Sequence, residues 1–168
     1  MSAPTRRRYV LGLVYAEGDR VTTEAGTWTV HPNLCGTHPS SSMFVVGCRK
    51  MTGPRDARGF NGFGGTIRDD EMPLSAMIRE LREESGLTVA PTLIRPFGTL
   101  GGETWTVDLF AMAVPLGQAP GIGERDAVLV APADRLPVAC AVGMRALVPL
   151  GLLARSGTLD WVTLACTT

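Results

Sequence analysis

Three glutamates that stand close together are the residues best placed to do chemistry. Glu80, Glu83 and Glu84 occupy positions i, i+3 and i+4, a spacing that places three carboxylates on one side of an α-helix. Clustered acids repel one another, and an ordinary surface helix interleaves them with Lys or Arg. The cluster is typical of a site for a hard cation bound by oxygen, with Mg²⁺ the usual candidate. A solvated helix face is the alternative interpretation.

The residues around these acids predict a short, well-bounded helix. Pro73 suits its first turn, where a missing N–H costs nothing. Gly86 stands where a left-handed C-terminal cap is expected. The acids then lie in the last turns, where negative charge opposes the helix dipole, and a broken local rule of this kind indicates a functional site. The apolar stripe that faces a core is predicted to be Leu74, Met77, Ile78 and Leu81.

The helix and the glycine loop before it resemble the Nudix box, Gly-x5-Glu-x7-Arg-Glu-(apolar)-x-Glu-Glu-x-Gly-(apolar). All of the specified positions are present at the required spacing: Gly65, Glu71, Arg79, Glu80, Leu81, Glu83, Glu84, Gly86 and Leu87. The preceding residues 60–65, Phe-Asn-Gly-Phe-Gly-Gly, look like the loop of MutT-type Nudix enzymes that hydrolyse oxidised purine nucleoside triphosphates.

The resemblance implies a metal-dependent hydrolase of phosphorus-containing acid anhydrides, acting on nucleoside diphosphates linked to another group. Glu84 would be a principal ligand of Mg²⁺, for which Mn²⁺ could substitute. Glu80, Glu83 and the carbonyl of Gly65 would complete the metal site. This chemistry is consistent with the residues, because phosphoryl transfer needs charge neutralised and a water molecule positioned.

The resemblance also implies which residues brace the site and which kind of residue acts as the general base. Arg79 would pair with Glu71 and hold the loop and the helix in shape, which is a structural part of the catalytic set. One of the carboxylates could instead be the general base, and members of the family differ on which. Many Nudix enzymes add a carboxylate from a later loop. Glu124, Asp126 and Glu103 are candidates here, and plain surface acids are the alternative.

Substrate contacts are predicted from the loop before the helix. Asn61, Gly64 and Gly65 would meet the nucleotide, and Asn61 can read a base edge because its amide both donates and accepts. The alternative is a turn-forming Asn before Gly62. Residues 138–147 contain no acid, although the oxidised-purine enzymes place paired acids there. Four aromatic residues could stack on a base or could belong to the core: Phe60, Phe63, Phe97 and Trp105.

The loop over residues 31–42 and the strand after it hold residues of the types that bind zinc, which offers a second interpretation. His31, Cys35 and His38 lie close together and Cys48 follows, but their spacing matches no strong zinc pattern. The segment is also rich in Pro, Gly, Ser and Thr, as an irregular loop is. The chain has four cysteines without paired spacing, so free thiols in a reducing cytoplasm are expected.

Composition predicts one globular domain that acts on a small molecule. The chain has 168 residues, 45% hydrophobic and 19% charged, with a formal net charge of zero. A protein that binds nucleic-acid polymers usually carries a net positive charge, which this chain lacks. A single nucleotide held through a metal does not require a positively charged surface. The sequence has no apolar run of 18 residues, so we expect no membrane segment. Arginines 6–8 before an apolar stretch could mimic a signal peptide, but a first strand is favoured.

The predicted element order favours an α/β/α sandwich with a mixed sheet, in agreement with the Nudix fold. Strands are expected at residues 9–15, 43–50, 93–100, 104–114, 127–130 and 159–165, with a hairpin-like segment at 21–30. A second helix is expected over residues 140–155, kinked or divided by Pro149. The domain spans residues 1–168, with a loop or hairpin insertion at about residues 20–42.

Three functions remain open from the sequence. The leading one is a pyrophosphohydrolase that converts a nucleoside triphosphate, oxidised or non-standard, into a nucleoside monophosphate and pyrophosphate. The second keeps the chemistry but acts on ADP-ribose or another nucleotide sugar. The third is a nucleotide-binding Nudix module without turnover, which the complete set of acids disfavours.

Overall fold

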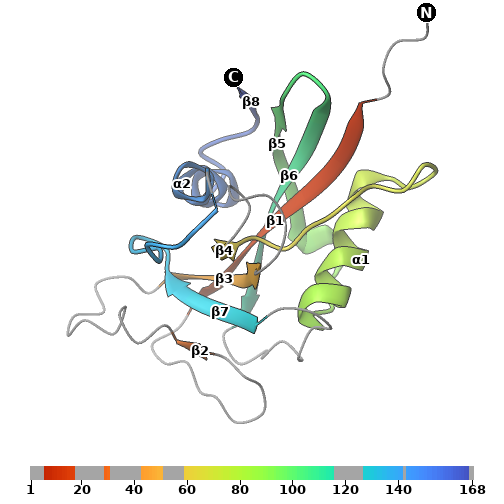
Figure 1. Ribbon diagram of the computed structural model, residues 1–168. Coiled ribbons are helices and arrows are strands. Elements are labelled where there is room, and N and C mark those ends of the chain that lie inside the picture. The colour runs from red at the N-terminus through yellow and green to blue at the C-terminus, as the bar shows by residue number, and fades with distance from the viewer. Residues whose placement is uncertain are drawn as a thin grey trace, which may run out of the picture.

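The computed structural model describes residues 6–17, 29–30, 43–50, 59–115, 127–141 and 143–166. These residues form eight strands and two α-helices (Figure 1). The strands are β1 (Arg7–Glu17), β2 (Thr29–Val30), β3 (Met43–Lys50), β4 (Gly59–Asn61), β5 (Ile94–Gly101), β6 (Trp105–Pro115), β7 (Ala127–Pro132) and β8 (Val162–Ala165). The helices are α1 (Pro73–Ser85) and α2 (Met144–Arg155), and a 3₁₀ turn covers Pro91–Leu93.

The strands make one mixed sheet in the order β2-β7-β3-β1-β6-β5-β8, with β4 paired to β3. β1 lies at the centre, parallel to β6 along its whole length and antiparallel to β3 over its last four residues. β5 is antiparallel to β6 and parallel to β8. The predicted mixed sheet is therefore confirmed, and the apolar stretch after arginines 6–8 is its central strand.

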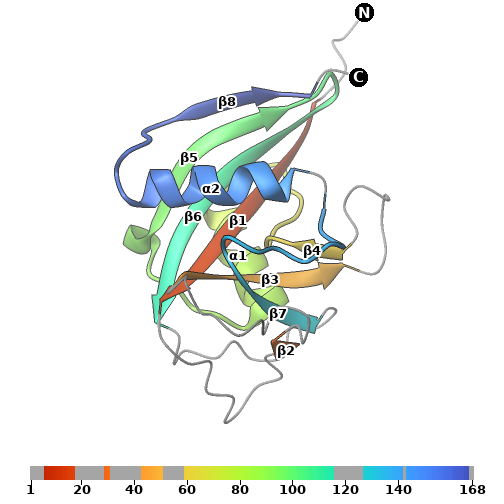
Figure 2. The ribbon, with the colours of Figure 1, turned by 90° about the vertical axis from the view of Figure 1, so that its left-hand side faces the viewer.

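The alternation of side chains along β1 assigns one helix to each face of the sheet (Figure 2). Val10 and Val14 belong to the buried cluster under α1, whereas Leu13 and Tyr15 belong to the cluster under α2. Gly12 faces α1 so closely that an added Cβ would meet the Met77 side chain at 2.7 Å. These contacts confirm the α/β/α sandwich.

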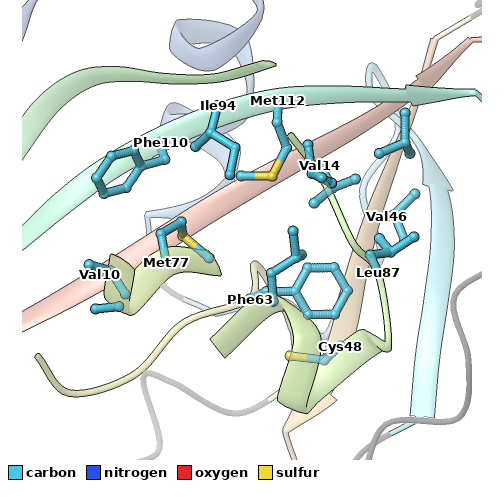
Figure 3. Close-up of a cluster of buried hydrophobic side chains, with 14 of the residues drawn as sticks. Val10, Val14, Val46, Cys48, Phe63, Met77, Leu87, Ile94, Phe110 and Met112 are labelled. Carbon is cyan, nitrogen blue, oxygen red and sulfur yellow. The ribbon is translucent and has the colours of Figure 1, made fainter. Parts of the chain in front are cut away.

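The stripe predicted from the sequence packs into the core on the α1 side. Figure 3 shows Met77 among the buried side chains of this core. Met77 and Leu81 are buried, and Leu74 and Ile78 pack against the cluster while partly exposed. On the other side, the Tyr15 hydroxyl donates a 2.7 Å hydrogen bond to the carbonyl of Val148 in α2. Burial raises the pKa of that hydroxyl, so it stays protonated and keeps its bond.

Both ends of α1 match the prediction. The helix begins at Pro73, and Gly86 follows it with φ 71°, the left-handed conformation that glycine adopts without strain. The Gly86 N–H donates to the carbonyl of Arg82 at 2.9 Å. Ser85 adds a tie that the sequence did not predict, because its buried hydroxyl donates to the carbonyl of Leu81 and accepts the N–H of Leu87. These hydrogen bonds fix the C-terminal end of α1, the helix that carries the acids.

The prediction for the second helix was partly wrong. The expected residues 140 and 141 do not join α2, because the segment that holds them pairs with β4. The Phe60 N–H donates to the Ala139 carbonyl at 2.9 Å, and the Ala141 N–H donates to the Phe60 carbonyl at 2.8 Å. The helix is not divided at Pro149, which lies exposed inside it. Packing of the buried face of α2 outweighs the one backbone hydrogen bond that proline removes. The last strand covers Val162–Ala165 only.

Most of the predicted insertion at residues 20–42 lies outside the described residues. Its described part, Thr29–Val30, is strand β2 and pairs with β7. Among the residues that the structure describes, no helix has the length and apolar character needed to cross a membrane.

Candidate active site

The glycine loop lies along the first half of β1, on the edge that β3 leaves open. Gly12 donates to the Phe63 carbonyl at 2.7 Å, and Val10 donates to the Gly65 carbonyl at 2.9 Å. The approach is so close that a Cβ on Gly64 would overlap the backbone of Val10. A side chain at this position would therefore separate the loop from the central strand.

Arg79 and Glu71 form a two-pronged ion pair between α1 and the end of the loop. Arg79 Nε donates to Glu71 Oε1 at 2.9 Å, and Nη2 donates to Oε2 at 2.8 Å. The same Oε2 accepts the backbone N–H of Arg68 at 3.1 Å. Side chains of both partners are mostly shielded, with 18% and 15% exposed. This geometry agrees with the bracing role that the resemblance implied.

The remaining donors of Arg79 connect the brace to the acids of α1. Nη1 donates to Glu80 Oε1 at 2.7 Å and to Glu83 Oε2 at 3.4 Å, and Nη2 also donates to the Thr66 carbonyl at 3.0 Å. A guanidinium has five N–H groups in a fixed plane, and these contacts employ every nitrogen. One side chain therefore holds the loop, Glu71 and two of the clustered acids together.

Glu80 and Glu84 reach the loop at neighbouring glycines. Glu84 Oε2 accepts the Gly64 N–H at 2.8 Å. The Glu80 carboxylate lies against Gly65, where a Cβ would overlap it. A side chain at position 65 would displace the Glu80 carboxylate from the loop. The two acids thus reach the same short piece of backbone, at Gly64 and Gly65.

Charge at the brace is fixed over the ordinary pH range. The Arg79 guanidinium and the Arg68 N–H hold the pKa of Glu71 at about 2, below its ordinary 4.5. The same ion pair, with a contribution from Glu80, raises the pKa of Arg79. Glu71 is therefore fully committed to the brace as an anion and is poorly suited to accept a proton.

The donor chemistry of the site fits a divalent cation. Carboxylates of Glu80, Glu83 and Glu84 and the carbonyl of Gly65 are hard oxygen donors, the ligands that Mg²⁺ prefers. Gly65 uses one lone pair for the Val10 N–H and keeps a second. In the part of the chain that the structure describes, no three acid, His or Cys side chains converge as a ready metal cage. Arg79 stands beside two of the acids instead.

Several predicted residues lie outside this cluster or outside the described residues. Glu124, Asp126 and the His31/Cys35/His38 loop fall in segments that the structure does not describe. Glu103 is exposed at the far end of the sheet, where its carbonyl accepts from Arg6. Three cysteines, Cys48, Cys140 and Cys166, form no disulfide, as predicted, and the Cys48 thiol donates to the Gly62 carbonyl at 3.4 Å.

The structure places the aromatic residues and the amide that were predicted to contact a base. Phe60, Phe63 and Phe97 are buried core residues and expose at most 1% of their surface, so the core interpretation is confirmed for them. Trp105 lies over Gly102 at the start of β6. Asn61 closes β4, and its Oδ1 accepts the N–H of Gly62 at 2.9 Å. This bond joins adjacent residues, whereas the side-chain bond of an Asx turn reaches the N–H two residues on.

One open concavity of about 370 Å³ lies elsewhere, at the ends of β5, β6 and β8. Neither the acids of α1 nor the glycine loop lines it. Its wall includes Arg6, Thr99, Glu103, Thr106, Thr163 and Cys166.

No protein-family model matches the chain, and no curated protein sequence matches it either. Solved structures do. A NUDIX hydrolase from Nitrosomonas europaea is similar at 15% identity and a TM-score of 0.62, over 99% of this chain and 82% of that one. MutT, from a comparison of the Aliivibrio salmonicida and Vibrio cholerae proteins, is similar at 17% identity and a TM-score of 0.54, over 88% and 98%.

A MutT/nudix family protein from Enterococcus faecalis is also similar, at 11% identity and a TM-score of 0.54. The match covers 76% of this chain but only 44% of the Enterococcus protein. Identities this low establish the fold alone. The chain has the fold of the Nudix hydrolases, as the motif predicted.

Proposed function

We propose that the chain is a divalent-metal-dependent Nudix hydrolase that cleaves a nucleoside triphosphate to a nucleoside monophosphate and pyrophosphate. One observation carries the proposal. The complete Nudix box lies on this fold with its brace assembled, because Arg79 joins Glu71, Glu80 and the loop carbonyl of Thr66. Acids on an ordinary solvated helix face would not be packed against a glycine loop, as Glu80 and Glu84 are here.

Each residue has a part in this proposal. Glu80, Glu83, Glu84 and the Gly65 carbonyl would hold Mg²⁺ or Mn²⁺, which when bound would neutralise phosphate charge and make a water molecule a better nucleophile. The Gly64 N–H orients Glu84, since it already donates to one carboxylate oxygen at 2.8 Å. One of the three carboxylates would instead act as the general base and leave the metal to the other two.

Arg79 and Glu71 act as positioning residues in this proposal. They fix the loop against α1 and so hold the backbone of the loop next to the carboxylates that would bind the metal. Glu71 is not the base, because its pKa of about 2 makes it too weak to take a proton from water.

A triphosphate is preferred as substrate because residues 60–65 look like the loop of the MutT-type enzymes. Asn61, Gly64 and Gly65 would then contact the nucleotide. Loop backbone at Gly64 lies within hydrogen-bonding distance of Glu84, so a nucleotide bound there would meet the proposed metal.

A nucleotide sugar such as ADP-ribose is the second candidate substrate. Two observations favour it: residues 138–147 contain no acid to read an oxidised purine, and Asn61 Oδ1 is engaged with its own neighbour Gly62. A binding module without turnover is the third candidate, and the complete acid set argues against it.

A product assay separates these candidates. The purified protein is incubated with a panel of nucleoside triphosphates and nucleotide sugars in Mg²⁺, and the products are resolved by chromatography. A monophosphate with pyrophosphate supports the triphosphate proposal, and two monophosphate products support the sugar alternative. Binding of a nucleotide without any product would overturn both in favour of the binding module.

A further inference from the structure

We propose that Arg79 has two separate tasks, one for each side of its guanidinium. Nε and Nη2 brace the loop through Glu71, whereas Nη1 is a built-in counter-cation on Glu80 and Glu83 that a divalent metal displaces. Metal binding would then exchange one cation for another, because the acids do not form an empty preorganised site. This inference rests on the proposed metal-dependent function.

The hydrogen bonds of Arg79 divide cleanly between its two sides. Nε and Nη2 bind Glu71 at 2.9 and 2.8 Å, and Nη2 adds the Thr66 carbonyl at 3.0 Å. Nη1 contacts only acids of α1, Glu80 at 2.7 Å and Glu83 at 3.4 Å, among the hydrogen bonds within the described residues. The two sides therefore have different partners, so Glu80 and Glu83 can leave Nη1 while Glu71 keeps its bonds to Nε and Nη2.

Burial explains why Glu80 needs a counter-cation. Its side chain is only 14% exposed, and its carboxylate lies against Gly65. A shielded carboxylate without a paired charge is costly, and Nη1 of Arg79 supplies that charge. Glu83 is 48% exposed, so water can stabilise it and its longer contact with Nη1 matters less.

A divalent ion on Glu80 would conflict with the guanidinium. Both cations would share one carboxylate, and like charges a few ångströms apart in a shielded site repel strongly. The Nη1 contact would therefore lengthen or break when the metal binds, while the contact between Glu71 and Nε would remain. Glu80 would pass from one cation to the other without ever being left unpaired.

The exchange predicts that Arg79 weakens metal binding to the free protein. Arg79→Gln removes the competitor and should tighten Mn²⁺ binding by roughly tenfold, the equivalent of one charge-assisted hydrogen bond no longer broken. Glu71→Gln is the matched control, because it damages the same brace but leaves Nη1 on Glu80. Its affinity for Mn²⁺ should stay equal to the parent's or become weaker.

The test measures Mn²⁺ affinity without nucleotide, by electron paramagnetic resonance of the free ion, in the parent and both variants after each is shown to be folded. Tighter binding in Arg79→Gln but not in Glu71→Gln supports the exchange. Equal or weaker binding in Arg79→Gln, while the parent binds Mn²⁺, overturns this inference alone. A parent protein that binds no Mn²⁺ overturns the proposed metal-dependent function as well.

A second measurement needs no substitution. In the ¹⁵N-labelled parent, Mg²⁺ should shift and broaden the Arg79 Nη1 signals while the Nε–H signal keeps its position, because only the counter-charge side is released. Nη1 and Nε signals that both stay unchanged at saturating Mg²⁺ would overturn the exchange.

Discussion

The brace between Arg79 and Glu71 should contribute measurably to the stability of the fold. Glu71→Gln keeps the shape of the side chain but removes its charge and presents an amide N–H₂ where one guanidinium N–H now donates. Two charge-assisted hydrogen bonds, at 2.8 and 2.9 Å, are lost or weakened. Both partners are more than four-fifths shielded, so solvent screens the pair only in part.

The expected loss follows from these contacts. Hydrogen bonds to charged groups contribute about 1.5–3 kcal/mol, so we expect Glu71→Gln to lower the free energy of unfolding by about 2 kcal/mol. Asp70→Asn is the matched control in the same loop, because Asp70 is exposed. That variant should stay within about 0.5 kcal/mol of the parent.

The pH dependence tests the origin of the effect. The pKa of Glu71 is about 2 in the folded chain and 4.5 ordinarily. Because the folded value is the lower one, the stabilisation is complete above pH 4.5 and is lost as the pH falls toward 2. The difference between parent and Glu71→Gln should therefore shrink across that range.

Urea unfolding followed by tryptophan fluorescence, at pH 7 and at pH 3, measures both quantities for the parent and the two variants. A Glu71→Gln variant as stable as the parent at pH 7 would refute the brace. A stability difference that is the same at both pH values would refute its ionic origin.

Three further predictions concern activity. Glu84→Gln should lower kcat by about 100-fold or more, since a central charged ligand is removed with its shape kept; a near-normal rate in steady-state kinetics would rule out this metal face. Gly65→Ala should also lower kcat, because its Cβ would push the Glu80 carboxylate away, and an unchanged kcat would contradict that packing. Asn61→Ala should raise KM and flatten discrimination among bases, at a cost of about 1–3 kcal/mol; parent-like selectivity over the nucleotide panel would leave Asn61 as a turn residue only.

The site helix was predictable because its signals are local. Pro73, Gly86 and the apolar stripe lie within one short segment, and a helical period needs no partner to be recognised. The positions of the acids followed from the same period. The pairing of Arg79 with Glu71 came from the resemblance, since spacing alone does not say which way a guanidinium points.

Contacts between distant segments could not be read from the sequence. Residues 140 and 141 were expected to begin the second helix but belong to the segment that pairs with β4, and nothing in their composition indicates that partner. The carbonyl of Thr66 and the N–H of Gly64 take part in the site as backbone groups, which every residue has. Gly12 did carry a signal, because a glycine inside an apolar strand indicates a close neighbour, here Met77.

The central claim is that the acids of α1 make this chain a metal-dependent hydrolase. The most direct measurement is a ³¹P NMR time course of a nucleoside triphosphate with the parent protein, in Mg²⁺ and in excess chelator, and with Glu84→Gln in Mg²⁺. We predict that pyrophosphate and monophosphate signals grow only for the parent in Mg²⁺. Equal product formation in chelator, or in Glu84→Gln, would contradict the claim.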